Sequence, residues 1–192
     1  MKKVKQILEN SIAVKQAILS DDEILQAICS INALLGKCFS SGNKLLLCGN
    51  GGSASDAQHL ACEFSGRFKL NRSALFAEAL HVNSSALTAI ANDYGYEEVY
   101  SRMLESKGAK DDVLIAISTS GNSANVVNAA AKAKELGMTV VGFSGQKEGN
   151  MDAHCDILIK VPSDDTPRIQ EAHITIGHII CEIVELKLFD KK

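Results

Sequence analysis

The chain has 192 residues, a length that suits one domain and is short for two. Its 20 Lys and Arg against 23 Asp and Glu give a net charge of −3, and 46% of its residues are apolar, enough for a sizeable core. This balance argues against an acidic disordered tail and a broad basic surface for nucleic acid, and the lack of Trp argues against a stacking platform for single strands.

Two amphipathic helices are predicted at the start of the chain. Apolar residues repeat at helical spacing from about residue 3 to 19. Ser20 and Glu23 then have the spacing of a capping box, which would begin a second helix that ends near residue 41.

Short apolar runs alternate with helical stretches from residue 42 onward. The expected strands are 44–48, 76–82, 113–117, 139–143 and 157–161. The expected helices are 54–65, 84–91, 95–107, 123–136 and 167–189. Because the strands are continuously apolar, they are typical of a parallel sheet that is covered on both faces. With right-handed crossovers this predicts an α/β fold: a three-layer, doubly wound five-stranded parallel sheet with two extra N-terminal helices.

The cysteines and the N-terminus indicate a compartment. The six cysteines form no CxxC pair and several lie in apolar runs, so free buried thiols in a reducing compartment are the simpler interpretation. Glu9 and Asn10 interrupt the first apolar stretch before a signal-peptide core can form. No run approaches the roughly 20 apolar residues of a membrane-spanning helix. We therefore expect a cytoplasmic protein with no membrane partner.

The first candidate site is the glycine-rich turn 49–54, which follows the first expected strand. Ligands of open parallel sheets bind at this edge, and a helix start with free N–H groups favours an anion. Ser53 and Asp56 have the spacing of a capping box, so a plain strand-to-helix turn is the alternative. The turn also matches the spacing of the dinucleotide fingerprint, but no acidic residue lies about 20 positions further on. We therefore expect no nucleotide cofactor.

The second candidate site is the turn STSGNS, residues 118–123, after the third expected strand. Its hydroxyls, its glycine and the following helix N-terminus form a cradle for a phosphate without needing Lys or Arg. A serine-rich helix cap is the alternative, but one cap needs one hydroxyl and this turn supplies four. The turn therefore predicts a site for a phosphate-sized anion.

Two pairs of polar residues lie on predicted helices. His59 and Glu63 are four residues apart, so they share one face; an isolated pair of this kind is more often a surface ion pair. Gln170 and His178 are about 80° apart around a strongly apolar helix. They either satisfy each other in the core or point into a pocket.

These features together resemble the phosphoheptose isomerases of the SIS-domain superfamily. The stretches that carry the resemblance are CGNGGSASDAQHLACEFSGRF, TAIANDYG, ISTSGNSANVVNAA and RIQEAHITIGHIICEIVE, in register from about residue 20 to 190. The STSGNS turn marks only the superfamily. The more specific signal is a set of four side chains: His59, Glu63, Gln170 and His178.

The resemblance implies an aldose–ketose isomerase that converts D-sedoheptulose 7-phosphate to D-glycero-D-manno-heptose 7-phosphate, an early step toward bacterial surface heptose in lipopolysaccharide or capsule. Proton transfer between C1 and C2 through an enediol needs a base and an acid, which by resemblance are Glu63 and His178. The implied substrate-binding residues are Asn50, Gly51, Gly52, Ser53, Glu63, Asn92, Asp93, Ser118, Thr119, Ser120, Ser123 and Gln170.

The resemblance further implies a metal and an assembly. Some family members carry zinc, so one zinc per subunit is expected on four positions: His59, Glu63, Gln170 and His178. An amide oxygen is an uncommon zinc ligand. The family implies a homotetramer of one SIS domain, residues 1–192, with the helices of 1–41 at subunit contacts and the α/β core in 42–192. The exposed apolar stripe expected on the first helix agrees with this.

A non-catalytic relative is the main alternative. Some proteins of the superfamily resemble this chain in fold but bind the replication initiator and have no isomerase activity. Neither such a binding module nor a sugar-phosphate sensor needs a base and an acid, whereas this chain has both Glu63 and His178. We therefore expect an enzyme.

Overall fold

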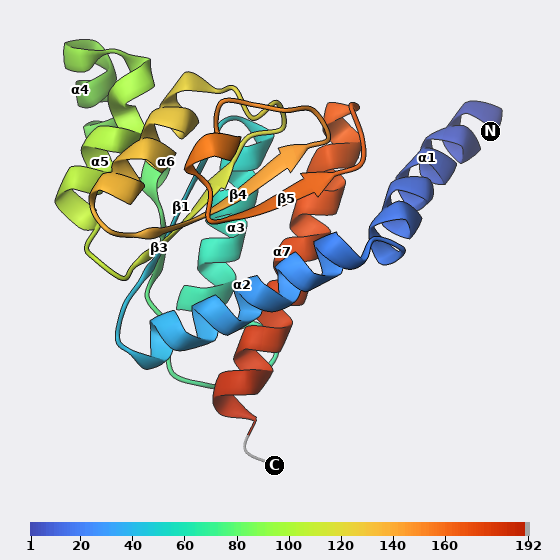
Figure 1. Ribbon diagram of the computed structural model, residues 1–192, viewed down its shortest axis with the longest axis horizontal. Helices are drawn as coiled ribbons and strands as arrows, with labels where there is room; N and C mark the ends of the chain where they lie inside the picture. Colours follow the sequence, from blue (N-terminus) through green and yellow to red (C-terminus); the bar gives the residue numbers. More distant parts are fainter. Residues whose placement is uncertain (191–192) are drawn as a thin grey trace.

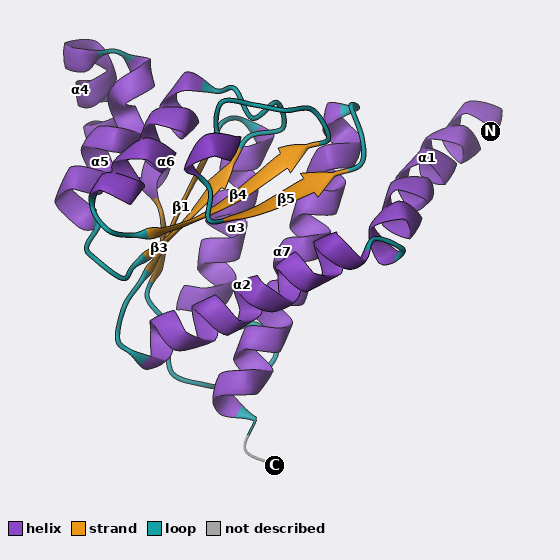
Figure 2. Cartoon of the chain, in the orientation of Figure 1, coloured by secondary structure: helices purple, strands orange, loops and turns teal. Residues whose placement is uncertain are grey.

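Helices cover both faces of a five-stranded sheet in the computed structural model of the chain, which describes residues 1–190 (Figure 1). The last two residues of the expected domain, 191–192, lie outside the described residues. The strands, which Figure 2 shows as the central layer, are β1 Leu45–Gly49, β2 Ala77–Ala79, β3 Val113–Ile117, β4 Thr139–Gly145 and β5 Ile157–Val161. Their order is β2-β1-β3-β4-β5, and every neighbouring pair is parallel. The predicted doubly wound parallel sheet is confirmed.

The burial of the sheet explains its continuous apolar runs. Every residue of β1 and β3 is buried. Because alternate side chains of a strand point to opposite faces, Leu45 and Leu47 enter one core while Leu46 and Cys48 enter the other. Each face therefore requires apolar residues, and the alternation typical of a half-exposed strand is absent from β1.

Residues 1–190 form seven α-helices. They are α1 Lys2–Leu19, α2 Asp22–Ser40, α3 Gly52–Ser65, α4 Ser84–Tyr94, α5 Val99–Lys107, α6 Ala124–Glu135 and α7 Thr166–Phe189. Short 3-10 turns occupy Leu80–Val82, Tyr96–Glu98 and Asp152–His154. Helices α2, α3 and α7 pack on one face of the sheet, and α5 and α6 pack on the other. None of the helices described is long and apolar enough to cross a bilayer.

Several expected boundaries differ from the structure: the helix expected over 95–107 begins at Val99 after a 3-10 turn, α4 runs on to Tyr94 and β4 to Gly145. Three further differences have a clear physical cause. The second strand pairs over Ala77–Ala79 only, because it is an edge strand whose flanking Phe76 is exposed and whose continuation turns into a 3-10 turn. Asp21, not Ser20, is the N-cap of α2, and its carboxylate accepts hydrogen bonds from the N–H groups of Glu23 and Ile24. The third difference is at α3 and is described with the site.

Helix α1 projects away from the body of the molecule (Figure 1). Of its residues only Ile18 is buried, whereas Val4, Leu8 and Ile12 are each more than half exposed. Polar contacts tie it to α7: the Ser11 hydroxyl donates to Glu171 Oε2 at 2.7 Å. The apolar stripe expected on this helix is therefore present and uncovered in the single chain.

Candidate active site

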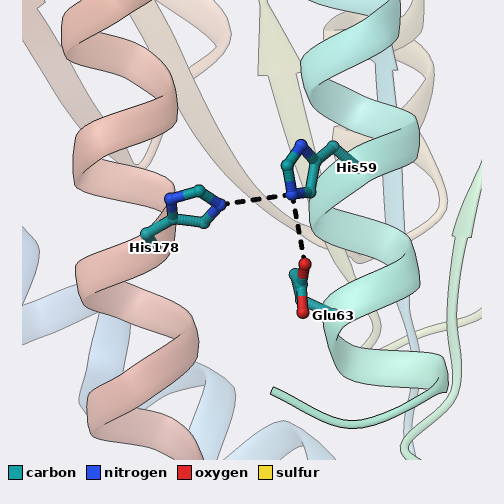
Figure 3. Close-up of side chains that lie close together, drawn as sticks. All are labelled: His59, Glu63 and His178. Carbon is teal, nitrogen blue, oxygen red and sulfur yellow. Dashed lines mark hydrogen bonds and ion pairs between the residues drawn. The ribbon is translucent and has the colours of Figure 1, made fainter. Parts of the chain in front are cut away.

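Three titratable side chains from α3 and α7 converge between these helices (Figure 3). His59 Nε2 lies 3.1 Å from Glu63 Oε1 and 3.3 Å from His178 Nε2. One ligand atom from each of the three residues lies within 4.8 Å of the others. His59 and Glu63 share a face of α3, as their spacing predicts. The imidazole of His178 reaches them from a helix 119 residues away in the chain.

A glycine makes this close approach of α7 to α3 possible. A Cβ atom on Gly177 would lie only 2.5 Å from Leu60 Cδ2, and Leu60 is itself buried on α3. Gly177 directly precedes His178. A glycine inside a strongly apolar helix costs helix stability, so its presence signals a packing constraint. Gly177 therefore sets the distance at which His178 faces His59.

Two rings lie beside the imidazole of His178. The His59 ring meets it edge-on with centroids 5.0 Å apart, and the Phe68 ring lies 5.7 Å away at an interplanar angle of 35°. The side chain of Glu63 is 22% exposed and that of His59 is 49% exposed. A polar ligand can thus reach the carboxylate from solvent, while the rotation of His178 is restricted.

The glycine-rich turn starts α3 without the expected capping box. Gly51 is the N-cap with a φ of 54°, and no side chain among the described residues caps this helix end. Ser53 is buried inside the first turn, and the Oδ2 atom of Asp56 is buried with no partner in residues 1–190. The capping-box interpretation is wrong, because the left-handed Gly51 places the helix start two residues earlier. Backbone carbonyls of Asn50 and Gly51 accept the N–H groups of Ser53, Ala54 and Ser55, so within residues 1–190 only the N–H of Gly52 in this first turn stays free for a ligand.

Gln170 lies against this turn. A Cβ atom on Gly52 would lie 2.5 Å from Gln170 Nε2, so only a glycine permits the amide to approach so closely. Gln170 is two turns before His178 on α7. The amide therefore connects the start of α3 to the helix that carries His178.

A second polar network joins the turn after β1 to α6. The side-chain amides of Asn50 and Asn125 exchange hydrogen bonds of 2.8 and 2.9 Å, and the Tyr96 hydroxyl donates to Asn50 Oδ1 at 3.2 Å. Asn92 and Asp93 are exposed at the end of α4, where their described hydrogen bond runs to each other. Asn50 is thus held in place by hydrogen bonds. Within residues 1–190, no hydrogen bond joins the other expected sugar-binding pair, Asn92 and Asp93, to Asn50.

The STSGNS turn leaves the N-terminus of α6 open. Ser118 and Ser123 share a hydrogen bond of 3.0 Å between their hydroxyls, and in the described part of the chain Ser123 makes no capping bond to the helix. Gly121 has a φ of 66°. Thr119 and Ser120 line a hollow with the segment after β4 and with Ser163 and Asp164 after β5. No serine side chain caps α6 in the described residues, although the Ser120 hydroxyl accepts a hydrogen bond from the N–H of Asn122 at 3.1 Å. The N–H groups of Thr119 and Ser120 have no partner within residues 1–190 and can meet an anion.

Three residues at the site were not expected there from the sequence: Asp56, which was expected only as a possible cap, Phe68 and Tyr96. Burial raises the pKa of Asp56 to about 6, while the charge of His59 acts in the opposite direction. Asp56 lies one turn before His59 on α3, and this spacing could have indicated that its carboxyl faces the same site. Phe68 follows α3 in an irregular segment, and Tyr96 lies in a 3-10 turn. Both reach the site only through tertiary packing, so neither spacing nor composition indicates them.

Comparisons with known proteins give consistent findings. The family model described as SIS domain matches residues 5–145. A phosphoheptose isomerase of Clostridium acetobutylicum is 51% identical over 185 residues, which cover 96% of this chain and 94% of the relative. The solved phosphoheptose isomerase of Neisseria gonorrhoeae has a TM-score of 0.90 at 40% identity, covering 96% of this chain and 97% of its own. That of Francisella tularensis has a TM-score of 0.91 at 33% identity, covering 95% and 96%.

Proposed function

The chain belongs to the phosphoheptose isomerases of the SIS-domain family and is an aldose–ketose isomerase, and from this premise we propose that it converts D-sedoheptulose 7-phosphate to D-glycero-D-manno-heptose 7-phosphate. The product would enter the synthesis of bacterial surface heptose. The observation that carries the proposal is the convergence of Glu63 and His178, from different helices, on one solvent-accessible point.

These two side chains can perform the proton transfers of the reaction. Glu63 would remove a proton from C1 of the ketose, while His178 donates a proton to the C2 oxygen and the enediol forms. Return of a proton to C2 and loss of the proton from the C1 hydroxyl then yield the aldose. The exposure of the carboxylate allows it to meet a carbon acid, and the rings beside His178 keep its imidazole at the same point.

The two turns at the carboxyl edge of the sheet would hold the substrate. Residues 118–123 would bind the phosphate through hydroxyls and the open N-terminus of α6. Residues 50–53 would bind sugar hydroxyls, together with Asn92, Asp93 and Gln170. Support comes from the parallel pairing of β1 with β3, in which Gly49 is opposite Ile117, so both turns begin at the same level.

We also propose a zinc ion, one per subunit. The donor set fits zinc, because two imidazole nitrogens and a carboxylate oxygen converge and such ligands are ordinary for this metal. His59, Glu63 and His178 would hold it through one donor atom each, and Gln170 would be the fourth ligand. The second oxygen of Glu63 and the second ring nitrogen of His178 would then remain for the proton transfers. When bound, zinc would polarise the substrate carbonyl.

The assembly and the compartment are further proposals. The uncovered apolar side chains of α1 support subunit contacts through the helices of residues 1–41, in a homotetramer of one SIS domain per chain whose α/β core is residues 42–192. All six cysteines are free thiols in the structure, which supports a cytoplasmic location.

Incubation with D-sedoheptulose 7-phosphate, with and without a chelator, tests the function. We expect the aldose phosphate to form, and a chelator to lower the rate. A purified protein that binds the sugar phosphate but forms no aldose, with or without added zinc, would contradict the proposed reaction.

A further inference from the structure

A buried ion pair joins the segment after α3 to α7, close to the backbone of Glu63. Arg72, in the segment that follows α3, pairs with Glu185 of α7; its Nε lies 2.9 Å from Glu185 Oε1, and each side chain is 2% exposed. The two residues are 113 positions apart in the chain. Taking two charges out of water is costly, so such a pair persists only when its hydrogen-bonding groups are well satisfied.

The guanidinium of Arg72 caps the end of α3. Its Nη2 donates to the backbone carbonyl of Glu63 at 2.8 Å, and its Nη1 donates to the carbonyls of Phe64 and Ser73 at 2.9 Å and of Gly66 at 3.3 Å. The last carbonyls of a helix have no partner within the helix and attract positive charge. Arg72 therefore fixes the backbone of the last helical turn of α3, which carries the Glu63 side chain.

The carboxylate of Glu185 holds the segment that carries Phe68. It accepts hydrogen bonds from three consecutive backbone N–H groups, those of Phe68 at 3.0 Å, Lys69 at 2.7 Å and Leu70 at 2.9 Å. Burial opposes the charge of Glu185, but these donors and Arg72 outweigh it and lower the pKa of the carboxyl. Glu185 thus stays ionised and keeps the Phe68 ring beside His178.

We infer that Arg72 and Glu185 are positioning residues for the isomerisation, an inference that rests on the proposed function. One end of the pair fixes the backbone of Glu63, and the other fixes the ring that flanks His178. Neither residue touches the reacting atoms. Their role is to hold the base on α3 and the acid on α7 at a constant separation.

A second ion pair, with a buried carboxylate and a lysine side chain that is 21% exposed, provides the control. Lys44 Nζ lies 2.5 Å from Asp112 Oδ2, and the Asp112 side chain is 2% exposed, like that of Glu185. The Asp112 carboxylate also accepts hydrogen bonds from the backbone N–H groups of Lys44 and Ala109. This pair lies before β1 and β3, at the edge of the sheet opposite the two ligand-binding turns. A purely structural effect of neutralising a buried, hydrogen-bonded carboxylate should therefore appear in both places.

The test compares Arg72→Lys, Glu185→Gln and Asp112→Asn in the full chain. A lysine keeps the charge but lacks the planar fork that reaches several carbonyls. We expect all three variants to lose thermal stability. Arg72→Lys and Glu185→Gln should lower kcat for sedoheptulose 7-phosphate by about ten-fold or more with KM within about two-fold, because misplaced catalytic groups cost turnover. Asp112→Asn should leave kcat within about two-fold of the parent. Equal effects on kcat at the two pairs would overturn the inference.

A milder variant keeps the inference testable if the ion-pair variants do not fold. Phe68→Leu preserves apolar bulk and leaves the backbone hydrogen bonds to Glu185 in place. We expect the imidazole proton signals of His178 in nuclear magnetic resonance to shift as the ring current is lost, and kcat to fall at unchanged KM. Unshifted signals or a parental kcat would refute the role given to Glu185, which acts through Phe68. If the parent itself has no turnover, the proposed function fails, and the His178 signals of Arg72→Lys and Glu185→Gln then test the positioning role; unshifted signals in both variants would overturn it.

Discussion

Replacement of Gly177 by Ala should separate the two halves of the candidate active site. The new Cβ would lie 2.5 Å from Leu60 Cδ2, whereas ordinary contact begins near 3.4 Å, so Leu60 or α7 must move by about 1 Å. Overpacking of this kind costs about 1–3 kcal/mol, and the better helix propensity of Ala returns about 1 kcal/mol. We expect a net loss of about 1 kcal/mol and a fall in Tm of about 2–4 °C.

The expected effect on turnover is larger than the effect on stability. A displacement of 1 Å at a catalytic group can cost about a hundred-fold in rate, so kcat should fall by about ten- to a hundred-fold while KM changes little. Steady-state kinetics with sedoheptulose 7-phosphate and thermal unfolding measure both quantities on the same preparation.

Gly36→Ala is the matched control for this variant. Gly36 is a buried glycine of α2, and its added Cβ would meet only the flexible Lys187 side chain at 3.4 Å. It should raise the unfolding free energy by up to about 1 kcal/mol and leave kcat unchanged. A Gly177→Ala protein with parental kcat would refute the claim that the approach of α7 to α3 sets the catalytic geometry.

Three further predictions concern the phosphate, a buried histidine and the metal. Ser120→Ala should raise KM for the sugar phosphate with little change in kcat, and a parental KM in steady-state kinetics would count against the STSGNS turn as the phosphate site. Burial lowers the pKa of His173 from 6.5 to about 4, so the unfolded chain binds more protons between these values and stability falls as the pH drops through this window, by about 3 kcal/mol at most. His173→Gln keeps a donor for the carbonyl of Ser144, and urea unfolding at pH 7 and 4.5 should show a smaller fall than in the parent; equal falls would contradict this. Zinc at about 100 times its Kd should raise the unfolding free energy by about 2.7 kcal/mol in the parent and not in His59→Ala, as calorimetry would show; an equal rise in both would place the metal elsewhere.

Local periodicity accounts for what could be predicted of the fold. The continuous apolar runs of β1 and β3 require burial on two faces, so their position inside a parallel sheet follows from the residues alone. The edge strand β2 was predicted too long, because pairing with one neighbour ends it after three residues. The start of α2 was misplaced by one residue, since Ser20 and Asp21 are both good caps and only the geometry distinguishes them.

The candidate site was predictable only within each helix. The spacing of His59 and Glu63 places them on one face of any α-helix. That His178 meets them depends on the distance between α3 and α7, which Gly177 and Leu60 determine through a contact that no local pattern encodes. The resemblance to a known family supplied this grouping.

The turnover of Glu63→Gln and His178→Gln tests the central claim most directly, because that claim requires both side chains to act on one bound substrate. Each variant should bind sedoheptulose 7-phosphate with near-parental affinity and lose nearly all turnover. The double variant should be little worse than either single one, because residues that act as a unit are not additive. Turnover near the parental rate in either single variant would contradict the account.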